Sequence, residues 1–164
     1  MGELPIVSRL RRELETLRAE LRRDLPRQLE AARAHGDIRE NAEYDAAKQR
    51  QGVLAARVAQ LEHRIAELSR FSLDAVPRDR AAYGSRVTLV ELETGDEVTF
   101  ELVFPEELGN GEEGGRVSIG SPIGRALVGR REGDEVTIHT PSGRRVYEIV
   151  GLETLHERSR DAAE

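Results

Sequence analysis

The sequence predicts an α+β protein in which an N-terminal antiparallel α-helical coiled-coil hairpin is followed by a small β-rich domain with one short helix. Two apolar stripes with helical spacing lie within residues 1–70, and alternation of apolar and polar residues begins after residue 84. A helical stripe has to be buried against a partner, whereas period-two alternation is typical of half-buried strands. We expect the hairpin to cover residues 1–75, a linker 76–84, and the β-rich domain 85–164.

The two apolar stripes are mirror images of each other. The first contains Val7, Leu10, Leu14, Leu17 and Leu21, and the second contains Leu54, Val58, Leu61, Ile65 and Leu68. When the stripes are paired from the outside inwards, the residue numbers of every pair add up to 75. Steps of three and four mark a coiled-coil seam. The mirrored register therefore predicts one helix over 8–35 and an antiparallel second helix from 37 to about 70.

The ends of the two helices carry recognisable signals. Pro5 suits a position at or before a helix start. Pro26 lies inside the first helix, where it removes a backbone hydrogen bond and should kink or locally break the helix. Gly36 suits the left-handed cap position. Asp37, followed three residues later by Glu40, resembles a capping box.

The seam also places charges at its edges. Glu13 and Glu20 fall at g positions of the first helix, and Arg57 and Arg64 fall at g positions of the second. Because g faces g in an antiparallel pair, we expect the ion pairs Glu13–Arg64 and Glu20–Arg57. Exposed pairs contribute only about 0–1 kcal/mol each, so they favour the register without determining stability.

The β-rich domain is predicted from runs rich in Val, Thr, Ile and Tyr that are separated by turn signals. The expected strands are 86–93, 96–104, 116–119, 134–140 and 144–152. One short helix should begin with Ser121 as N-cap and Pro122 at the first position, and should end before Gly129. We expect the polar tail from Thr154 to be frayed.

Composition narrows the classes of protein. The chain has 164 residues, 34% of them charged and 4% aromatic, with no Cys and a net charge of −6. Without Cys there is neither a disulfide framework nor a thiolate site, and the acidic balance argues against non-specific nucleic-acid binding. No signal core or membrane-spanning run is present, so we expect a cytoplasmic protein.

The predicted hairpin tip is acidic, and the residues alone leave two interpretations open. Asp37 and Glu40 could serve only as helix caps. However, Glu43 and Asp45 crowd the same end, which is more acid than a cap needs. Mg²⁺ takes one or two carboxylates plus waters or phosphates. The tip could therefore be a partial Mg²⁺ site that another macromolecule completes.

Two segments resemble a known family. The run from Gly36 to Lys48, GDIRENAEYDAAK, resembles the signature of the Gre transcript cleavage factors of bacterial RNA polymerase, and is closer to GreA than to GreB. The run Ser121–Gly129, SPIGRALVG, and the run Thr140–Gly143 resemble the family's C-terminal signatures. The resemblance extends over residues 8–153, with the signatures in the family's order.

The resemblance implies a fold and a mechanism. It implies an FKBP-like C-terminal domain that docks at the rim of the polymerase's secondary channel, while the coiled coil enters the channel. Asp37 and Glu40 then help to hold a second Mg²⁺ at the active site of a backtracked complex, and the polymerase hydrolyses its own nascent RNA near the 3′ end. The factor is not an enzyme by itself, binds no cofactor alone, and is expected to be a monomer.

Other residues receive roles with alternatives. Asn41 could orient a metal-bound water or cap the helix locally, and Tyr44 is expected to pack against the other helix. The family's docking surface implies polymerase contacts by Ser121, Pro122 and Ile123. Its basic patch suggests RNA contacts by Arg11, Arg18 and Arg22. These arginines could equally be solvated flanks of the coiled coil.

Two rival functions remain open. A regulator of the same shape could occupy the secondary channel and inhibit polymerase without cleavage, although retention of Asp37 and Glu40 favours the cleavage factor. A coiled-coil adaptor with no role at polymerase would leave the C-terminal signature unexplained. The N-terminus also departs from the family pattern, because the usual Thr and Gly before the first helix are not evident. Asp45 stands where a His is common.

Overall fold

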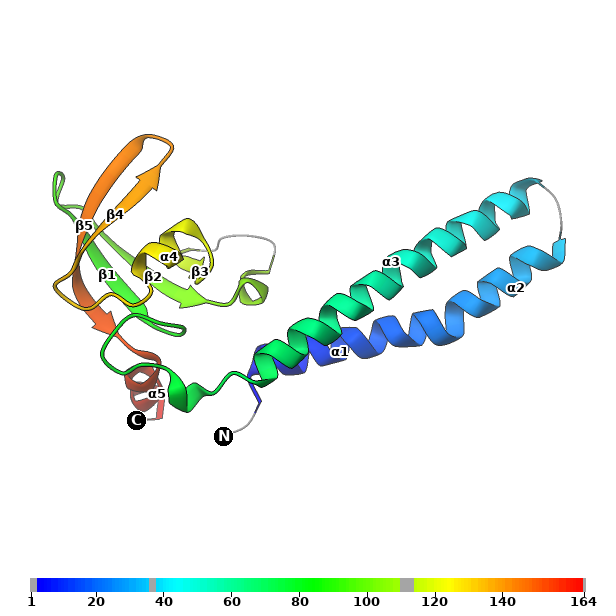
Figure 1. Ribbon diagram of the computed structural model, residues 1–164, viewed down its shortest axis with the longest axis horizontal. Coiled ribbons are helices and arrows are strands. Elements are labelled where there is room, and N and C mark those ends of the chain that lie inside the picture. The colour runs from blue at the N-terminus through cyan, green and yellow to red at the C-terminus, as the bar shows by residue number, and fades with distance from the viewer. Residues whose placement is uncertain (1–2, 36–37, 110–113, 164) are drawn as a thin grey trace. The chain divides into compact units, whose positions relative to one another are not determined.

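The chain divides into two compact units, Met1–Ser72 and Leu73–Glu164. Figure 1 shows the computed structural model, which describes residues 3–35, 38–109 and 114–163, without the side chains of 35 and 38–41. The first unit is helical, and the second is a five-stranded sheet with short helices. This arrangement confirms the predicted α+β fold class.

The first unit is a helical hairpin (Figure 1). Its elements are α1 (Pro5–Ala19), a π-helical turn (Glu20–Asp24), α2 (Leu25–His35) and α3 (Ile38–Ser69). Both predicted helices are therefore present. The first begins at Pro5, which occupies the first helical position. It starts three residues before the predicted boundary, and its early residues Ile6 and Val7 are buried.

Two features of the sequence explain why a π-helical turn forms at this position. Leu21, Leu25 and Leu29 are spaced by four residues each, so the seam holds one residue more than the alternation of threes and fours allows. A wider π turn takes up that residue, and Leu25 remains completely buried. Pro26 follows directly, and its missing N–H and bulky ring do not fit a regular α-helix interior. The predicted interruption is therefore a π turn.

The ion pairs at the seam lie one heptad away from the predicted ones. Arg57 Nη2 lies 2.9 Å from Glu13 Oε1, and Arg50 Nε lies 3.1 Å from Glu20 Oε1. The g-to-g prediction is right in kind, but the specific pairs Glu13–Arg64 and Glu20–Arg57 are wrong. A long Arg side chain reaches an acid on either side of its facing position, and sequence spacing does not decide between two exposed partners.

The second unit is a sheet in the order β3-β2-β1-β5-β4, in which β2 and β3 pair in parallel and the other neighbouring strands pair antiparallel. The strands are β1 (Arg86–Glu91), β2 (Glu97–Val103), β3 (Arg116–Ser118), β4 (Glu135–Thr140) and β5 (Gly143–Glu153). Each lies within two residues of its predicted bounds. The predicted short helix is α4 (Pro122–Leu127), and single 3₁₀ turns occupy Leu73–Ala75 and Pro105–Leu108.

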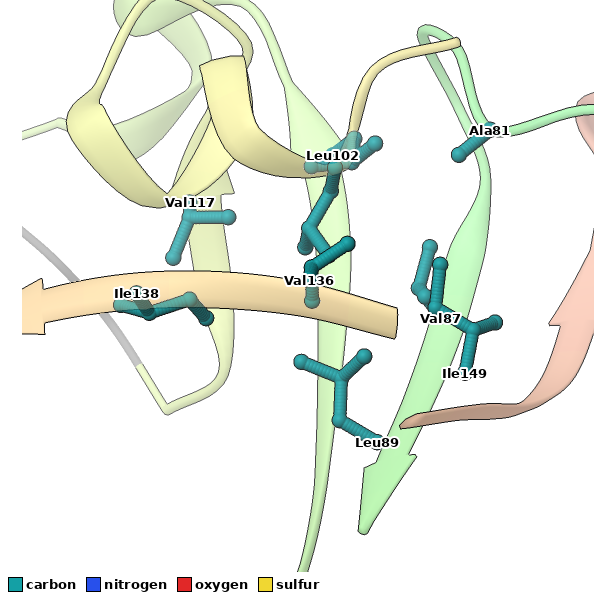
Figure 2. Close-up of a cluster of buried hydrophobic side chains, with 9 residues drawn as sticks. Ala81, Val87, Leu89, Leu102, Val117, Val136, Ile138 and Ile149 are labelled. Atoms are coloured by element: carbon teal, nitrogen blue, oxygen red, sulfur yellow. The ribbon is translucent and has the colours of Figure 1, made fainter. Parts of the chain in front are cut away.

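Apolar side chains from these strands and α4 form one core. Val87 and Leu89 alternate with more exposed residues along β1 and are completely buried. The cluster, shown in Figure 2, consists of Ala81, Val87, Leu89, Leu102, Val117, Leu127, Val136, Ile138 and Ile149. All five strands thus contribute to this core, and Leu127 of α4 packs among their side chains, which fixes where the Ser121–Gly129 segment lies.

The segment expected to be a linker, 76–84, is part of the second unit. Val76 and Ala81 are both buried. The Ala81 N–H donates to Arg130 O at 2.8 Å, and the Gly129 N–H donates to Ala81 O at 2.8 Å. The segment has no period because its backbone bonds to a loop and its few apolar residues are spaced irregularly. Segment 76–84 is therefore fixed by hydrogen bonds and packing, although its sequence has no periodic pattern that predicts this.

The tail is also ordered, contrary to the prediction that it is frayed. Residues Leu155–Ala163 form α5, and Thr154, the residue directly before this helix, is buried. The Glu157 carboxylate accepts a hydrogen bond from the Thr154 N–H at 3.0 Å. Thr154 and Glu157 are spaced as in a capping box. This signal was present in the sequence and predicts a helix start at that place.

Candidate functional site

The acidic tip lies where the two helices of the hairpin meet. Helix α2 ends at His35 and α3 begins at Ile38. Asp37 lies outside the described residues, as do the side chains of Glu40 and Asn41. The backbone of Glu40 and Asn41 belongs to the start of α3. The dipole of a helix favours negative charge in its first turn, and Glu40 is in that turn of α3.

A cationic and aromatic cluster follows the tip on one side of the hairpin. The Arg33 guanidinium carbon lies 5.7 Å from the centre of the Tyr44 ring, and Lys48 Nζ lies 5.9 Å from it. Arg33 Nη2 also donates to the Tyr44 hydroxyl at 3.3 Å. Tyr44 therefore packs across to α2, as predicted. Two cations held against one ring form an arrangement that can contact phosphates or a stacked base.

Each side of the hairpin is hollowed at this level. One hollow of about 370 Å³ is lined by Pro26, Leu29, Glu30, Arg33, Tyr44 and Lys48. The other, of about 520 Å³, is lined by Gln28, Ala31, Ala32, Glu43, Ala46, Ala47 and Arg50. The lining of the first hollow includes the cations Arg33 and Lys48, whereas four alanines line the second. The tip half thus has two chemically different faces.

The predicted RNA-binding arginines lie further from the tip. Arg11 Nε bonds Glu3 at 2.7 Å, and Arg18 Nη2 bonds Glu62 at 2.7 Å. The hydrogen bond to Glu62 raises the pKa of Arg18, and the bond from Arg11 lowers the pKa of Glu3. Arg22 is exposed in the π turn, and within the described ranges no carboxylate pairs with it. Arg33 and Lys48 are closer to the tip, and only the hairpin geometry brings them together.

The predicted docking residues Ser121, Pro122 and Ile123 open α4. Ser121 Oγ donates to Ser118 O at 2.7 Å and accepts from the Gly124 N–H at 3.1 Å, so it is fully used as an N-cap. Ile123 packs partly buried against the core. Only Pro122 is exposed among the three. It shares α4 with exposed Arg125 and is followed by Val128, which is 43% exposed.

Gly124 explains the spacing of this segment. A Cβ atom at Gly124 would lie 2.0 Å from Ser118 O and 2.9 Å from the Ile119 backbone. No side chain fits in that space, so glycine is required for α4 to approach the end of β3. Leu127, one turn later, is completely buried in the core. The segment is therefore first a packing device, and the exposed residues beside it are the candidates for binding.

A second polar cluster holds the 3₁₀ turn that follows β2. The Tyr83 ring stacks on Phe104 at 4.2 Å, and its hydroxyl donates to Glu107 Oε1 at 2.8 Å. Burial, together with the neighbouring Glu107 carboxylate, raises the pKa of Tyr83 well above its ordinary value. Tyr83 therefore stays neutral at physiological pH and acts here as a structural donor.

Two further searches cover the described part of the chain. Within residues 3–35, 38–109 and 114–163, no three His, Asp or Glu side chains lie close enough together to hold a metal ion. In the same ranges, no helix is both long and apolar enough to cross a membrane.

A two-helix hairpin whose turn is acidic in sequence, joined in one chain to a separate β-rich unit, defines a two-unit α+β protein. Comparison with known families agrees with that class. Residues 7–69 match the family model "Transcription elongation factor, N-terminal", and residues 76–154 match "Transcription elongation factor, GreA/GreB, C-term". The chain belongs to the GreA/GreB family of transcription elongation factors.

Individual relatives match along nearly the whole chain. The transcription elongation factor GreA of Anaeromyxobacter sp. strain K is 41% identical, over 91% of this chain and 89% of the relative. GreA of Desulfotalea psychrophila is 40% identical, over 89% of each chain. Among solved structures, the GreA factor homolog 1 (Gfh1) of Thermus thermophilus is 28% identical, over 90% of this chain and 94% of its own, with a TM-score of 0.41.

Proposed function

We propose that this protein is a transcription elongation factor that binds RNA polymerase, inserts its hairpin tip through the secondary channel, and stimulates cleavage of backtracked RNA. The single observation that carries the proposal is the place of the GDIRENAEYDAAK run. In this GreA/GreB family member, the run spans the junction of α2 and α3, which is the closed end of the helical hairpin.

The chemistry of such a tip fits a shared metal site. Hydrolysis of a phosphodiester by two metals needs one ion to activate the attacking water and another to stabilise the leaving oxygen. Mg²⁺ binds through one or two carboxylates and completes its shell with waters and substrate phosphates. Asp37 and Glu40 are assigned to hold such an ion together with polymerase. The protein would then supply ligands to the polymerase and would not hydrolyse RNA alone.

The other site residues support this assignment in different ways. Asn41 would orient a metal-bound water beside the acids. Arg33, Tyr44 and Lys48 offer positive charge and an aromatic face close to the tip, which suits the phosphates and bases of the nascent RNA 3′ end. On the β-rich unit, Pro122 is the exposed member of the Ser121–Ile123 group and is assigned to the polymerase surface.

The test is RNA cleavage in stalled, backtracked elongation complexes with Mg²⁺. Asp37→Ala and Glu40→Ala should each lower stimulated cleavage by at least about 10- to 100-fold, since losing even an outer partner of a metal ligand has that effect. Glu43→Gln is the matched control, because it removes one exposed charge from the same end of α3 and is expected to keep activity. Polymerase binding should persist in all three variants.

Two results would contradict the proposal. Binding without cleavage by the wild-type protein would favour the second candidate, a channel-occupying inhibitor of the same shape. Absence of binding to core polymerase would leave the hairpin as an adaptor whose tip acids serve only as helix caps.

A further inference from the structure

The two helices of the hairpin are both weakened at the same level, near the middle of their length. In the first helix, the π turn Glu20–Asp24 is followed by Pro26, which has no N–H to bond back towards that turn. In α3, the helix interior contains Gly52. Arg50 Nε bonds Glu20 Oε1 at 3.1 Å, so Gly52, two residues further on, lies at the level of the π turn. Prolines, glycines and π turns are the usual causes of bends in helices.

No contact in the folded hairpin explains Gly52. The residue is exposed, and a Cβ atom there would meet nothing within 4 Å beyond its own stretch of helix. This is the opposite of Gly124, where a Cβ would lie 2.0 Å from Ser118 O. A glycine in a helix interior is less favourable than alanine. Val53, the next residue, is β-branched and 61% exposed. Gly52 and Val53 therefore weaken α3 where packing gives no reason for it.

The apolar seam between the helices is also less enclosed at this level. Towards the base, Leu14 and Leu61 are 5% and 2% exposed, and towards the tip, Leu25 and Leu54 are 0% and 1% exposed. The seam residues between these two levels are only partly buried: Leu17, Leu21 and Val58. A change in their packing exposes less additional apolar surface than a change at either end would, and so costs less.

We propose that this level is a hinge, at which the tip half of the hairpin bends relative to the base half, and that Gly52 permits the bend in α3. The tip half is α2 with residues 38–51 of α3, and the base half is α1 with residues 53–69. Local sequence preferences are commonly broken where function requires it. The inference rests on the proposed function, because bending here moves the α2–α3 junction, whose acids are assigned to Mg²⁺.

The first arm of the test measures the hinge in the free full chain, by residual dipolar couplings of backbone amides in a weakly aligned sample. Motion of one half relative to the other averages its couplings, so amides of residues 42–50 should show a smaller degree of alignment than amides of 56–68. Gly52→Ala should reduce this difference. It should also slow hydrogen exchange of the amides of 52–56 by about 2- to 5-fold, because alanine disfavours local opening of the helix.

The matched control moves the glycine and keeps the composition. The double variant Gly52→Ala/Ala59→Gly places it two turns along the same face of α3, at another exposed position. There α3 lies beside a regular part of α1, where Arg57 Nη2 bonds Glu13 Oε1 at 2.9 Å. The variant should unfold with about the wild-type free energy, since one interior glycine remains. It should nevertheless lose the difference in alignment, as Gly52→Ala does.

The second arm measures cleavage in backtracked complexes at saturating protein. If the tip works from the bent conformation, Gly52→Ala lowers the population of that conformation by the ratio of the two helix propensities. Cleavage should then be about 2- to 5-fold slower, with unchanged binding to polymerase. The glycine-shifted double variant should show the same loss.

Equal alignment of the two halves in the wild-type protein would overturn the hinge. A difference in alignment that survives in the glycine-shifted variant would overturn the pairing of Gly52 with the π turn. Weaker binding of Gly52→Ala to polymerase would make Gly52 a contact residue and would also overturn the proposal. Lost motion with unchanged cleavage would overturn the use of the hinge in cleavage. Failure of the proposed function is seen separately, as absence of cleavage with the wild-type protein, and the alignment measurement then still confirms or refutes the hinge.

Discussion

The base and the tip halves of the hairpin are built differently. The base half, α1 with the C-terminal half of α3, buries large side chains: Val7, Leu10, Leu14, Leu61, Ile65 and Leu68. The tip half, α2 with the N-terminal half of α3, buries Leu25, Ala32, Ala47 and Leu54 and is hollowed on both sides. Both halves follow one seam, so the contrast comes from side-chain size.

Within this pair of helices, the base half supplies most of the stability and the tip half carries the proposed functional residues. Burial of a Leu, Ile or Val side chain contributes about 1.5–3 kcal/mol, and an alanine contributes much less. Most of the hairpin's stability therefore resides in the base. Small residues line the seam of the tip half, and Arg33, Tyr44 and Lys48 line the 370 Å³ hollow beside it. Of the two halves, the one proposed to enter another macromolecule contributes less to the stability of the hairpin.

The largest change in unfolding free energy should come from deleting single residues. Such deletions test whether the π turn keeps the apolar residues of α1 and α2 in one continuous seam against α3. Deleting Arg12 in α1 rotates Val7 and Leu10 away from α3, and should cost about 3–6 kcal/mol of unfolding free energy. Deleting Arg23 removes the extra residue of the π turn and restores regular steps of three and four. Denaturant unfolding followed by far-UV circular dichroism measures both changes.

Pro26 provides the control for the deletion of Arg23. The deletion alone leaves Pro26 inside a regular helix, at a cost of about 3 kcal/mol. Combined with Pro26→Ala, it should change the unfolding free energy by about 1 kcal/mol or less, close to a surface change. Equal losses for the Arg12 deletion and for the combined variant would refute the assigned role of the π turn.

An intermediate effect should distinguish the two halves by a matched pair of leucines. Leu61→Ala in the base removes a side chain that is 2% exposed and should cost about 2–5 kcal/mol. Leu29→Ala removes a half-buried leucine beside the 370 Å³ hollow and should cost about 1 kcal/mol. The same unfolding assay compares them. A loss for Leu29→Ala as large as that for Leu61→Ala would show that the tip half is as well packed as the base.

The smallest effect should come from the ion pairs. A double-mutant cycle with Glu13→Ala and Arg57→Ala should give a coupling energy of about 0.2–1 kcal/mol, because both side chains are more than 40% exposed. The corresponding cycle with Glu13→Ala and Arg64→Ala, the pair expected from spacing, should give no coupling. Coupling confined to Glu13 and Arg64 would restore the spacing-based register.

The sequence was most informative where one periodic pattern decided the outcome. The mirrored stripes predict the hairpin, and Ser121-Pro122 predicts the start of α4 to the residue. Prediction failed for residues 76–84, because their packing leaves no periodic pattern in the sequence. It also failed for the ion pair of Glu13, because Arg57 and Arg64 are equally reachable by sequence spacing. The cluster of Arg33, Tyr44 and Lys48 could not be predicted without the hairpin geometry, since Tyr44 lies eleven positions after Arg33 along the chain. The start of α5 was missed although Thr154 and Glu157 carry a capping signal.

The closeness of Gly124 to Ser118 O has a consequence for how such chains are recognised. A pattern search based on the Ser121–Gly129 run detects how a short helix packs against the end of a strand. Ser121, Gly124 and Leu127 all contribute to that packing. A descendant that had lost every contact with polymerase would still match. The diagnostic value for activity therefore lies in the other unit, in whether the turn of the hairpin keeps both of its acids.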